Sequence, residues 1–272
     1  MNVLPLEKKL AVISALVEGN SIRSTSRMTG ADRNTINSLL LRSGERCQQI
    51  MDANMRNLKC SFVQCDEIWT YVGKKDRHVR KDEDSPEMGS QWVFVAMDEE
   101  TKLVPIYTVG KRTKETTEEF LYGLQWRLND EHFQITTDGY VFYNAIQGIF
   151  AGRVDYAKLI KMFGNYSMDT PEARYSPPGI AEVISRVMEG RPDEDRICTS
   201  HVERQNLTMR MAMRRFTRLT NAFSKKLTNL KAACALHFAH YNFCRVHSSL
   251  RVTPAMAAGV TKEIWPLGAL LT

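Results

Sequence analysis

Two acidic residues of this chain lie in surroundings where an acidic side chain is unusual. Asp66 lies in the stretch VQCDEIW, which is otherwise rich in apolar and aromatic residues. A charge inside such a stretch destabilises a folded protein unless something compensates it, and a metal ion would do so. Glu203 stands at the head of a long segment, ending before Glu263, that contains no other acidic residue. Its carboxylate is either half of a weak surface ion pair or acts on something that the neighbouring positive charges bind.

The segment after Glu203 predicts a polyanionic partner. Between Arg204 and Lys262 the chain carries eleven Lys and Arg residues and no Asp or Glu, although the net charge of the whole chain is only +6. Phosphates bound by such a segment release their counterions, which favours binding of nucleic acid. A solvated helix face is the alternative, but solvated faces usually mix the two signs of charge.

The overall composition is that of a globular protein without a membrane segment. The chain has 272 residues, enough for one large domain and a small one, with 43% hydrophobic and 25% charged residues. It shows neither a signal-peptide pattern nor an apolar run as long as a membrane span, so we expect a cytoplasmic protein with no membrane partner. Its six cysteines are scattered without a CxxC pair, which favours reduced, mostly buried thiols over zinc ligands or disulfides.

Residues 1–45 predict a helix-turn-helix DNA-binding domain. A helix with apolar residues at helical spacing is followed by a short second helix, the turn glycine Gly30, and a third helix capped by Asp32. This succession is the pattern of a helix-turn-helix. The third helix would present side chains outward that can contact DNA, namely Arg33, Asn34, Asn37 and Arg42. A plain helical bundle or an oligomerisation module is the alternative, and residues 46–59 would form a helical linker.

Residues 60–260 predict an α/β domain. Runs of β-branched and aromatic residues alternate with amphipathic helical segments, and the first three runs suit an antiparallel meander. The expected strands are residues 61–72, 92–97, 103–109, 133–137 and 154–160. The expected helices are residues 116–129, residues 143–150 and a long helical region from 199 to about 243. Residues 161–198 are rich in Pro and Gly and indicate an insertion loop with one possible helix at 180–188, and residues 261–272 form a C-terminal tail.

This order of elements is that of the ribonuclease-H-like fold, a mixed five-stranded sheet flanked by helices. In that fold one catalytic carboxylate lies in the middle of the first strand, one just after the fourth strand, and one on the helix after the fifth. The residues at those places are Asp66, Asp138 and Glu203. Glu67 is the main rival of Asp66, because adjacent strand residues point to opposite faces and the apolar pattern does not show which face carries the site. Asp98 is another rival, in a stretch more typical of a turn.

Four motifs together resemble the DDE transposases, close to the insertion-sequence-one-like type, with a retroviral-integrase-like catalytic core. They are CDEIW, TTDGY, TSHVERQNLTMR and, in residues 240–259, HYNFCRVHSSLRVTPAMAAG. The resemblance covers roughly residues 55–260. It implies that Asp66, Asp138 and Glu203 bind two Mg²⁺ ions, with Mn²⁺ as a possible substitute. One departure is that many proteins of this type begin with a cysteine-paired zinc ribbon, a pattern that this sequence lacks.

The resemblance implies a DNA transposase that cleaves transposon ends and transfers the 3′-OH into target DNA, close to the bacterial nucleoid. Its partners would be the terminal inverted repeats and the target DNA, and pairing of two ends would require a homodimer or a larger assembly. We expect DNA contacts from the polar and basic residues near Glu203, which are His201, Arg204, Asn206, Arg210, Arg214 and Arg215. His201 could instead be an ordinary surface histidine. A non-catalytic repressor of transposase descent and a ribonuclease-H-like nuclease on another substrate are the alternatives.

Overall fold

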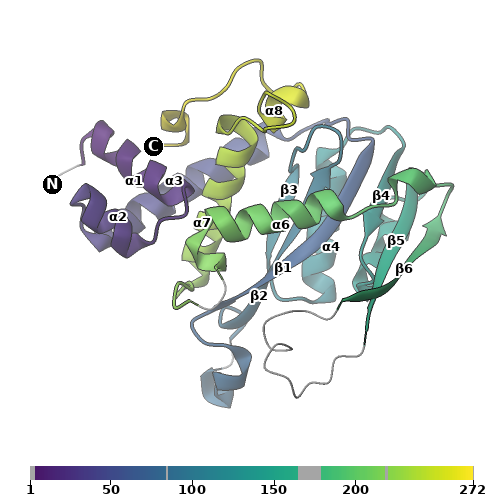
Figure 1. Cartoon of the computed structure of the whole chain (residues 1–272), viewed down its shortest axis with the longest axis horizontal. Coiled ribbons are helices and arrows are strands. Elements are labelled where there is room, and N and C mark those ends of the chain that lie inside the picture. Colours follow the sequence, from purple (N-terminus) through teal and green to yellow (C-terminus); the bar gives the residue numbers. More distant parts are fainter. Residues whose placement is uncertain (1–3, 84, 165–178, 218–219, 272) are drawn as a thin grey trace.

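A mixed six-stranded sheet forms the centre of the computed structural model, which describes residues 4–83, 85–164, 179–217 and 220–271 (Figure 1). The strands lie in the order β3-β2-β1-β4-β5-β6. Their bounds are Phe62–Val72 (β1), Gly89–Asp98 (β2), Ile106–Gly110 (β3), Phe133–Thr137 (β4), Val154–Phe163 (β5) and Ile180–Glu189 (β6). The first three strands pair antiparallel, as the meander predicts, whereas β4 is parallel to both β1 and β5. A mixed α/β architecture is therefore confirmed, with one strand more than the five expected.

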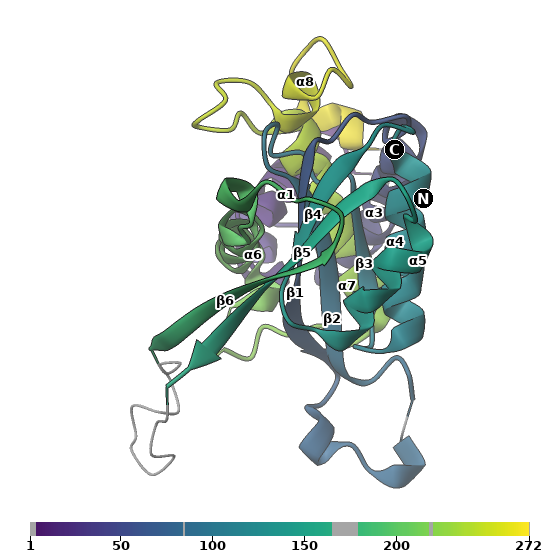
Figure 2. The same cartoon turned by 90° about the vertical axis from the view of Figure 1, so that its right-hand side faces the viewer.

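β6 replaces the helix that the sequence suggested at residues 180–188. The apolar residues of this segment recur at helical spacing, which explains the wrong expectation. They are Ile180, Val183, Ile184 and Val187. All of them are β-branched, however, and β6 pairs antiparallel with the edge of β5, so hydrogen bonding to that edge outweighs a weak helix preference. In Figure 2 these two strands extend as a hairpin away from the rest of the sheet. Residues 165–178 of the predicted insertion lie outside the described residues.

Helices cover both faces of the sheet (Figures 1 and 2). The helices are Leu6–Val17 (α1), Ile22–Thr29 (α2), Arg33–Asn54 (α3), Lys114–Arg127 (α4), Ala145–Ile149 (α5), Ser200–Ala212 (α6), Leu227–Ala239 (α7) and Pro254–Ala257 (α8). On one face, residues of α6 and α7 such as Val202 and Phe238 pack on Ile68 of β1. On the other face, Phe120 of α4 joins a second core with Phe94 of β2. None of the helices in the described part of the chain has the length and apolar character of a membrane span.

α3 runs without a break through the domain boundary predicted at residue 45. It begins after Asp32, whose side chain caps it by accepting a hydrogen bond from the backbone N–H of Asn34 (2.8 Å). Gly44 lies where α3 meets α7, since a Cβ at this position would lie 2.5 Å from the Cβ of Ala232. Apolar residues of α1 and α3 share one hydrophobic core with the sheet. The N-terminal helices are therefore packed on the sheet domain through a continuous helix.

His237 is a buried titratable residue of α7 that makes the stability of the fold depend on pH. Burial, followed by the charges of His240 and Arg245, lowers the pKa of His237 from 6.5 to about 3. Because the unfolded chain takes up this proton more readily, His237 lowers the stability of the fold as the pH falls from about 6.5 toward about 3. We expect His237→Gln to reduce the loss of stability between about pH 7.5 and about pH 5.5, measured as the free energy of unfolding.

A matched control for His237→Gln is His78→Gln, because His78 is exposed. This variant should leave the loss of stability below pH 6.5 in place. The assignment to His237 would be refuted if His237→Gln lost as much stability between the two pH values as the wild-type protein does.

Candidate active site

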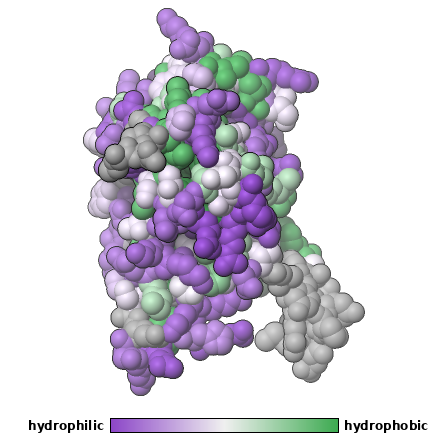
Figure 3. Space-filling view, turned by 90° about the vertical axis from the view of Figure 1, so that its left-hand side faces the viewer, coloured by the Kyte–Doolittle hydropathy of each residue, from purple (hydrophilic) through white to green (hydrophobic). Residues whose placement is uncertain are grey.

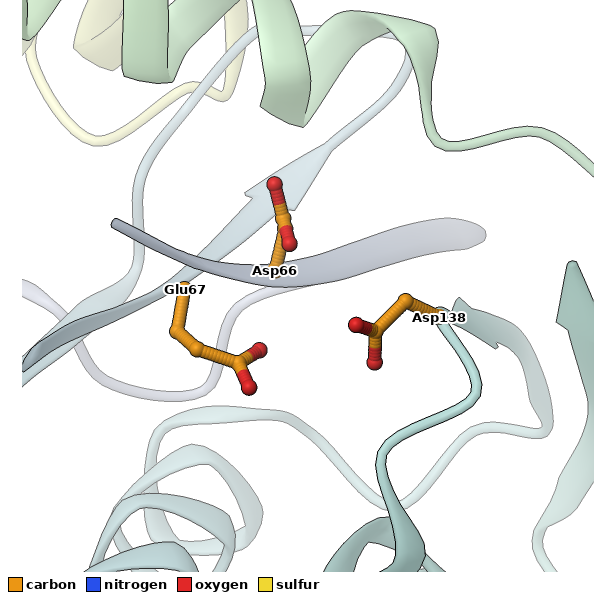
Figure 4. A group of neighbouring side chains, drawn as sticks. All are labelled: Asp66, Glu67 and Asp138. Carbon is orange, nitrogen blue, oxygen red and sulfur yellow. The ribbon is translucent and has the colours of Figure 1, made fainter. Parts of the chain in front are cut away.

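Asp66 and Asp138 lie side by side because their strands are parallel neighbours. The pairing of β1 with β4 ends at Cys65 and Thr137, and the residue that follows each of these in the sequence is an aspartate. Asp138 follows the last residue of β4, and its Oδ1 accepts a hydrogen bond from the backbone N–H of Tyr140 (2.9 Å). In Figure 4 the side chain of Asp138 points toward the acidic residues of β1. The sheet thus brings together two aspartates that are far apart in the sequence.

Asp66 faces α6 from the middle of β1. Its Oδ2 accepts a hydrogen bond from Nδ2 of Asn206, which belongs to α6 (2.8 Å). Burial, followed by the charges of Asp138 and Glu203, raises the pKa of Asp66 to about 6. A carboxylate that is crowded by like charges and shielded from water gains from a bound cation. Among the described residues, Oδ1 of Asn206 has no hydrogen-bond partner although it is buried.

Glu67 approaches the same point from the opposite face of β1, as Figure 4 shows. One carboxylate oxygen from each of Asp66, Glu67 and Asp138 lies within 4.8 Å of the other two. The alternation of strand residues therefore turns Asp66 and Glu67 in opposite directions but does not exclude Glu67 from the group. The side chain of Glu67 is 1% exposed, and its burial, followed by the charge of Asp138, raises its pKa to about 7.

Arg112, just after β3, provides the charge that balances Glu67. Its Nη2 and Nε atoms lie 2.6 and 2.7 Å from Oε1 of Glu67. The hydroxyl of Tyr143 donates a hydrogen bond to Oε2 of the same residue (3.1 Å). Both oxygens of Glu67 are thereby engaged, whereas among the described residues the only side chain that donates a hydrogen bond to Asp66 is the amide of Asn206. Asp66 is therefore the better placed of the two neighbours to bind a metal ion.

Two aromatic rings hold the guanidinium of Arg112 in place. Its Cζ lies 4.0 Å from the ring centroid of Tyr140 and 4.7 Å from that of Trp92. Its Nη2 also lies 3.8 Å from Oδ2 of Asp138. Stacking on aromatic faces and a planar fork of donors are properties that lysine could not supply at this position. Arg112 thus links the buried Glu67 to the loop that carries Asp138.

Glu203 lies in the first turn of α6, on the same side of the sheet as Asp66. Its Oε1 accepts a hydrogen bond from Oγ1 of Thr199 (2.5 Å) and forms an ion pair with Nζ of Lys161 on β5. The side chain is 41% exposed, and its charge contributes to the raised pKa of Asp66. Glu203 is therefore near Asp66 but does not belong to the group of carboxylates that lie within 4.8 Å of one another.

Gln64 determines where α6 lies on the sheet. Its Oε1 accepts hydrogen bonds from the backbone N–H groups of His201 (3.0 Å) and Val202 (3.2 Å). N–H groups at the start of a helix have no partner within the helix, so this contact both satisfies them and fixes the helix on β1. One turn later Asn206 reaches Asp66. Glu203 lies between these two contacts, and they hold its turn of the helix over β1.

The residues predicted to contact DNA fall into separate groups in the structure. Arg33, Asn34 and Asn37 line a cleft of about 1200 Å³, together with Arg214 and Arg215. The cleft therefore lies between the start of α3 and the basic segment after α6.

The remaining predicted DNA contacts are spread over α3 and α6. Arg42 and Arg204 are exposed, and Arg210 is half-buried on α6. Asn206 is 7% exposed and turned toward Asp66 instead of outward. Nδ1 of His201 lies 3.1 Å from Nζ of Lys102, and the burial of the ring, followed by the charge of Lys102, lowers the pKa of His201.

Asp98, the other acidic residue considered in place of Asp66, stabilises a turn, as the surrounding sequence indicated. It ends β2 and is 1% exposed. Its Oδ2 accepts hydrogen bonds from the backbone N–H (2.8 Å) and from Oγ1 (2.6 Å) of Thr101. The carboxylate of Asp98 is therefore used in the turn between β2 and β3.

Three cationic residues near the carboxylates were not singled out from the sequence. They are Arg112, Lys158 and Lys161. Lys158 is buried on β5 opposite Thr137 and donates a hydrogen bond to the backbone oxygen of Tyr140 (3.2 Å). The two lysines interrupt the strand sequence YAKLIKMF, so the reasoning that drew attention to Asp66 would have found them too. Arg112 has no such local signal.

No protein-family model matches this chain, and no curated protein does. Solved structures with some likeness to it are transposase complexes. The piggyBac transposase synaptic complex with hairpin DNA is 11% identical, with a TM-score of 0.39, over 97% of this chain and 68% of that one. The pre-cleavage Mos1 transpososome is 8% identical, with a TM-score of 0.23, over 57% of this chain and 60% of that one. The match thus spans less than two thirds of the Mos1 chain. Because these scores are so low, we infer the chemistry of the site from the residues of this chain alone.

Proposed function

We propose that this protein is a DNA transposase of the DDE type, close to the insertion-sequence-one-like proteins. It would cleave the ends of a mobile element and join the freed 3′-OH to target DNA in a single divalent-metal site. The observation that carries the proposal is the group formed by Asp66 of β1 and Asp138 at the end of β4, which lie with Glu67 within 4.8 Å of one another. In this proposal Glu203, which lies outside that group at the start of α6, would be the third ligand. The strand order and the four sequence motifs support the same interpretation.

The donor set of this site suits Mg²⁺. Asp66, Asp138 and Glu203 offer only carboxylate oxygens, which are the ligands that hard divalent cations take. The buried Oδ1 of Asn206, without a partner among the described residues, could accept a hydrogen bond from a water molecule at the site. Two bound Mg²⁺ ions, or Mn²⁺ in their place, would activate the attacking hydroxyl and stabilise both oxygens of an in-line displacement at phosphorus.

The other residues of the site would position the ligands and balance their charges. Asn206 orients Asp66, and Gln64 holds the start of α6 so that Glu203 stays near it. Lys161 balances Glu203 through an ion pair that must open before this carboxylate can serve as a metal ligand. Arg112 keeps Glu67 neutralised beside Asp138. With such a site no covalent protein–DNA intermediate is needed.

Recognition of the transposon ends would belong to α1–α3, which in this proposal act as a helix-turn-helix. Figure 3 shows that the face of the molecule on this side is largely hydrophilic. The cleft that Arg33 and Asn34 line also contains Lys225 and Lys226 of the basic segment, so DNA in it would meet cations from both parts of the chain. In the domain division we propose, residues 1–45 form the DNA-recognition domain and residues 46–59 a helical linker. Residues 60–260 form the catalytic domain, and residues 261–272 form a C-terminal tail. Pairing of two ends would require a homodimer or a larger assembly.

One assay separates the proposed function from its two alternatives, with DNA that carries the inverted repeats we expect on either side of the gene. In the presence of Mg²⁺ we expect cleavage at the end of the repeat and joining of the 3′-OH to a supercoiled plasmid. A repressor would shift the repeat DNA on a gel without cutting it. A nuclease would cut it without joining. Either result would refute the proposed transposase.

Arg33→Ala combined with Asn34→Ala should weaken binding to the terminal repeat far more than binding to unrelated DNA. A good contact to a base edge contributes about 1–3 kcal/mol, so we expect the loss of two contacts to lower specific affinity by about 30-fold or more, measured by gel shift. Cleavage of a pre-nicked substrate at high protein concentration should be retained. The exposed Lys262 gives a control variant, Lys262→Ala, which should keep the specific affinity. An equal loss on both DNAs would mean that the two residues contact phosphates and do not read bases.

A further inference from the structure

A groove beside the far end of β1 combines aromatic rings with positive charge. It has a volume of about 970 Å³, and it is lined by Trp69, Tyr71, Lys75, Arg77, Arg80 and Arg210, among others. We call it the aromatic groove. Among the described residues that line it there is no acidic side chain. Asp76, the nearest acid in the sequence, is turned to the backbone N–H of Ser90, to which its Oδ1 is hydrogen-bonded (2.6 Å).

Cations lie on the faces of Tyr71, which lines the aromatic groove, and of Phe223, which lines the neighbouring cleft. Tyr71 stacks on Phe223 with ring centroids 4.7 Å apart, and the centroid of Trp69 lies 5.7 Å from that of Tyr71. Nζ of Lys75 lies 5.8 Å from the Tyr71 centroid, and Nζ of Lys225 lies 3.7 Å from the Phe223 centroid. Lys75 is exposed, so a planar ligand in the groove could displace its ammonium from Tyr71 while the charge stays close by.

The aromatic groove lies beyond the carboxylates along β1, and by the alternation of strand residues its rings, Trp69 and Tyr71, project from the face of β1 that carries Glu67. One carboxylate oxygen of Glu67 lies within 4.8 Å of those of Asp66 and Asp138. Asn206 contacts Asp66, and Arg210, one turn further along α6, lines the groove with Trp69 and Tyr71. At about 3.3 Å per strand residue, Trp69 and Tyr71 lie about 10 and about 17 Å from Asp66 along β1. At about 3.4 Å per nucleotide of one DNA strand, this corresponds to about three to five nucleotides from a phosphate held at Asp66.

We propose that the aromatic groove binds a single DNA strand next to the cleavage site, with bases stacked on its rings and phosphates held by its cations. This inference rests on the proposed function, because it assumes that the scissile phosphate lies at Asp66. Base stacking on aromatic side chains within a positively charged groove is how proteins hold single strands without reading their sequence. The bases of an intact duplex keep their faces inside the helix, so a duplex could use only the cations. The rings therefore favour a strand that has separated from its complement.

The test measures binding of a fluorescently labelled oligo-dT and of a labelled hairpin duplex by anisotropy in EDTA, where no cleavage occurs. Lys75→Ala combined with Arg77→Ala should lower the affinity for oligo-dT by about 10-fold or more and reduce the salt dependence of log K by about 1.4. Tyr71→Leu should lower it by about 5-fold to 100-fold with little change in affinity for the duplex. Oligo-dT should quench tryptophan fluorescence in the wild-type protein but much less in Trp69→Phe.

The control variant is Lys59→Ala combined with Lys114→Ala, which removes the same charge at side chains that are 70% and 62% exposed and outside the groove. It should bind oligo-dT like the wild-type protein, and the thermal midpoint of every variant is measured to confirm folding. The inference is overturned if the control loses as much affinity as Lys75→Ala/Arg77→Ala, or if Tyr71→Leu lowers the affinities for strand and duplex equally. It is also overturned if oligo-dT quenches the fluorescence of Trp69→Phe as much as that of the wild type.

Failure of this inference differs from failure of the proposed function. Mg²⁺-dependent cleavage and joining by a protein whose groove variants bind oligo-dT normally would overturn the groove alone. Groove-dependent binding of oligo-dT in EDTA by a protein that never cleaves repeat DNA would support the groove as a strand-binding site and would refute the transposase.

Discussion

Asp66→Asn should lower the rate of metal-dependent DNA cleavage by about 10³-fold or more, because a two-metal site cannot form without one of its carboxylates. Asparagine has nearly the same volume and still offers an oxygen to Nδ2 of Asn206, so the fold should be retained. The raised pKa of Asp66 means that its ionised form is disfavoured in the metal-free protein. The variant should therefore unfold at the same or a higher temperature without metal, and it should lack the stabilisation by MgCl₂ that we expect of the wild type. We expect the same loss of cleavage from Asp138→Asn and from Glu203→Gln.

Two matched variants test whether Asp66 is the carboxylate of β1 that DNA cleavage requires. Glu67→Gln should retain cleavage within about 10-fold, because Arg112 and Tyr143 already engage the oxygens of Glu67. Asp98→Asn, the same substitution at the aspartate that closes the turn after β2, should also keep activity. DNA binding by gel shift in EDTA should be unchanged in all of these variants. If Glu67→Gln abolished cleavage while Asp66→Asn did not, the site would lie on the opposite face of β1.

Arg112→Met should destabilise the fold by removing the only cation that pairs with the buried Glu67 among the described residues. Breaking a buried ion pair costs about 3–5 kcal/mol. Because the side chain of Arg112 is 35% exposed, solvent screens part of this interaction, and we expect a loss of about 2–3 kcal/mol at alkaline pH. The raised pKa of Glu67, about 7, sets the pH dependence. Arg112 lowers this pKa, so the pKa of Glu67 rises further in the variant. Below about pH 7 Glu67 is protonated with or without Arg112 and the variant loses little, whereas above it the variant must either hold the proton or bury an unpaired charge.

A double-mutant cycle with Glu67→Gln tests this pairing directly. Urea unfolding at about pH 6 and about pH 8.5 gives the free energy of unfolding for the wild type, both single variants and the double variant. The double variant should recover most of the stability that Arg112→Met loses at the higher pH, since it no longer buries an unpaired charge. Equal destabilisation by Arg112→Met with and without Glu67→Gln would show that stacking on Trp92 and Tyr140, and not the ion pair, is what Arg112 contributes.

Several features of the fold follow from local signals in the sequence. Asp32 caps α3 through its own side chain, and Gly30 ends α2 with a positive φ of 66°. Strand residues rich in β-branched and aromatic side chains form β1, and the order of elements places β4 beside it. Where the local signal was ambiguous, as in the apolar residues of β6, the expected element was wrong because an open strand edge decided the outcome.

The sequence by itself determined which acidic residues were worth attention, because Asp66 in an apolar strand and Glu203 before a basic segment are visible without coordinates. Only the tertiary structure decided what surrounds them. Arg112 reaches Glu67 across 45 residues of sequence, and Lys161 reaches Glu203 across 42. The rings of Tyr71 and Phe223 meet only when the segment after α6 folds back on β1. Such pairs leave no local pattern, because their stabilising energy depends on distance and burial, which the chain acquires only when its distant segments pack together.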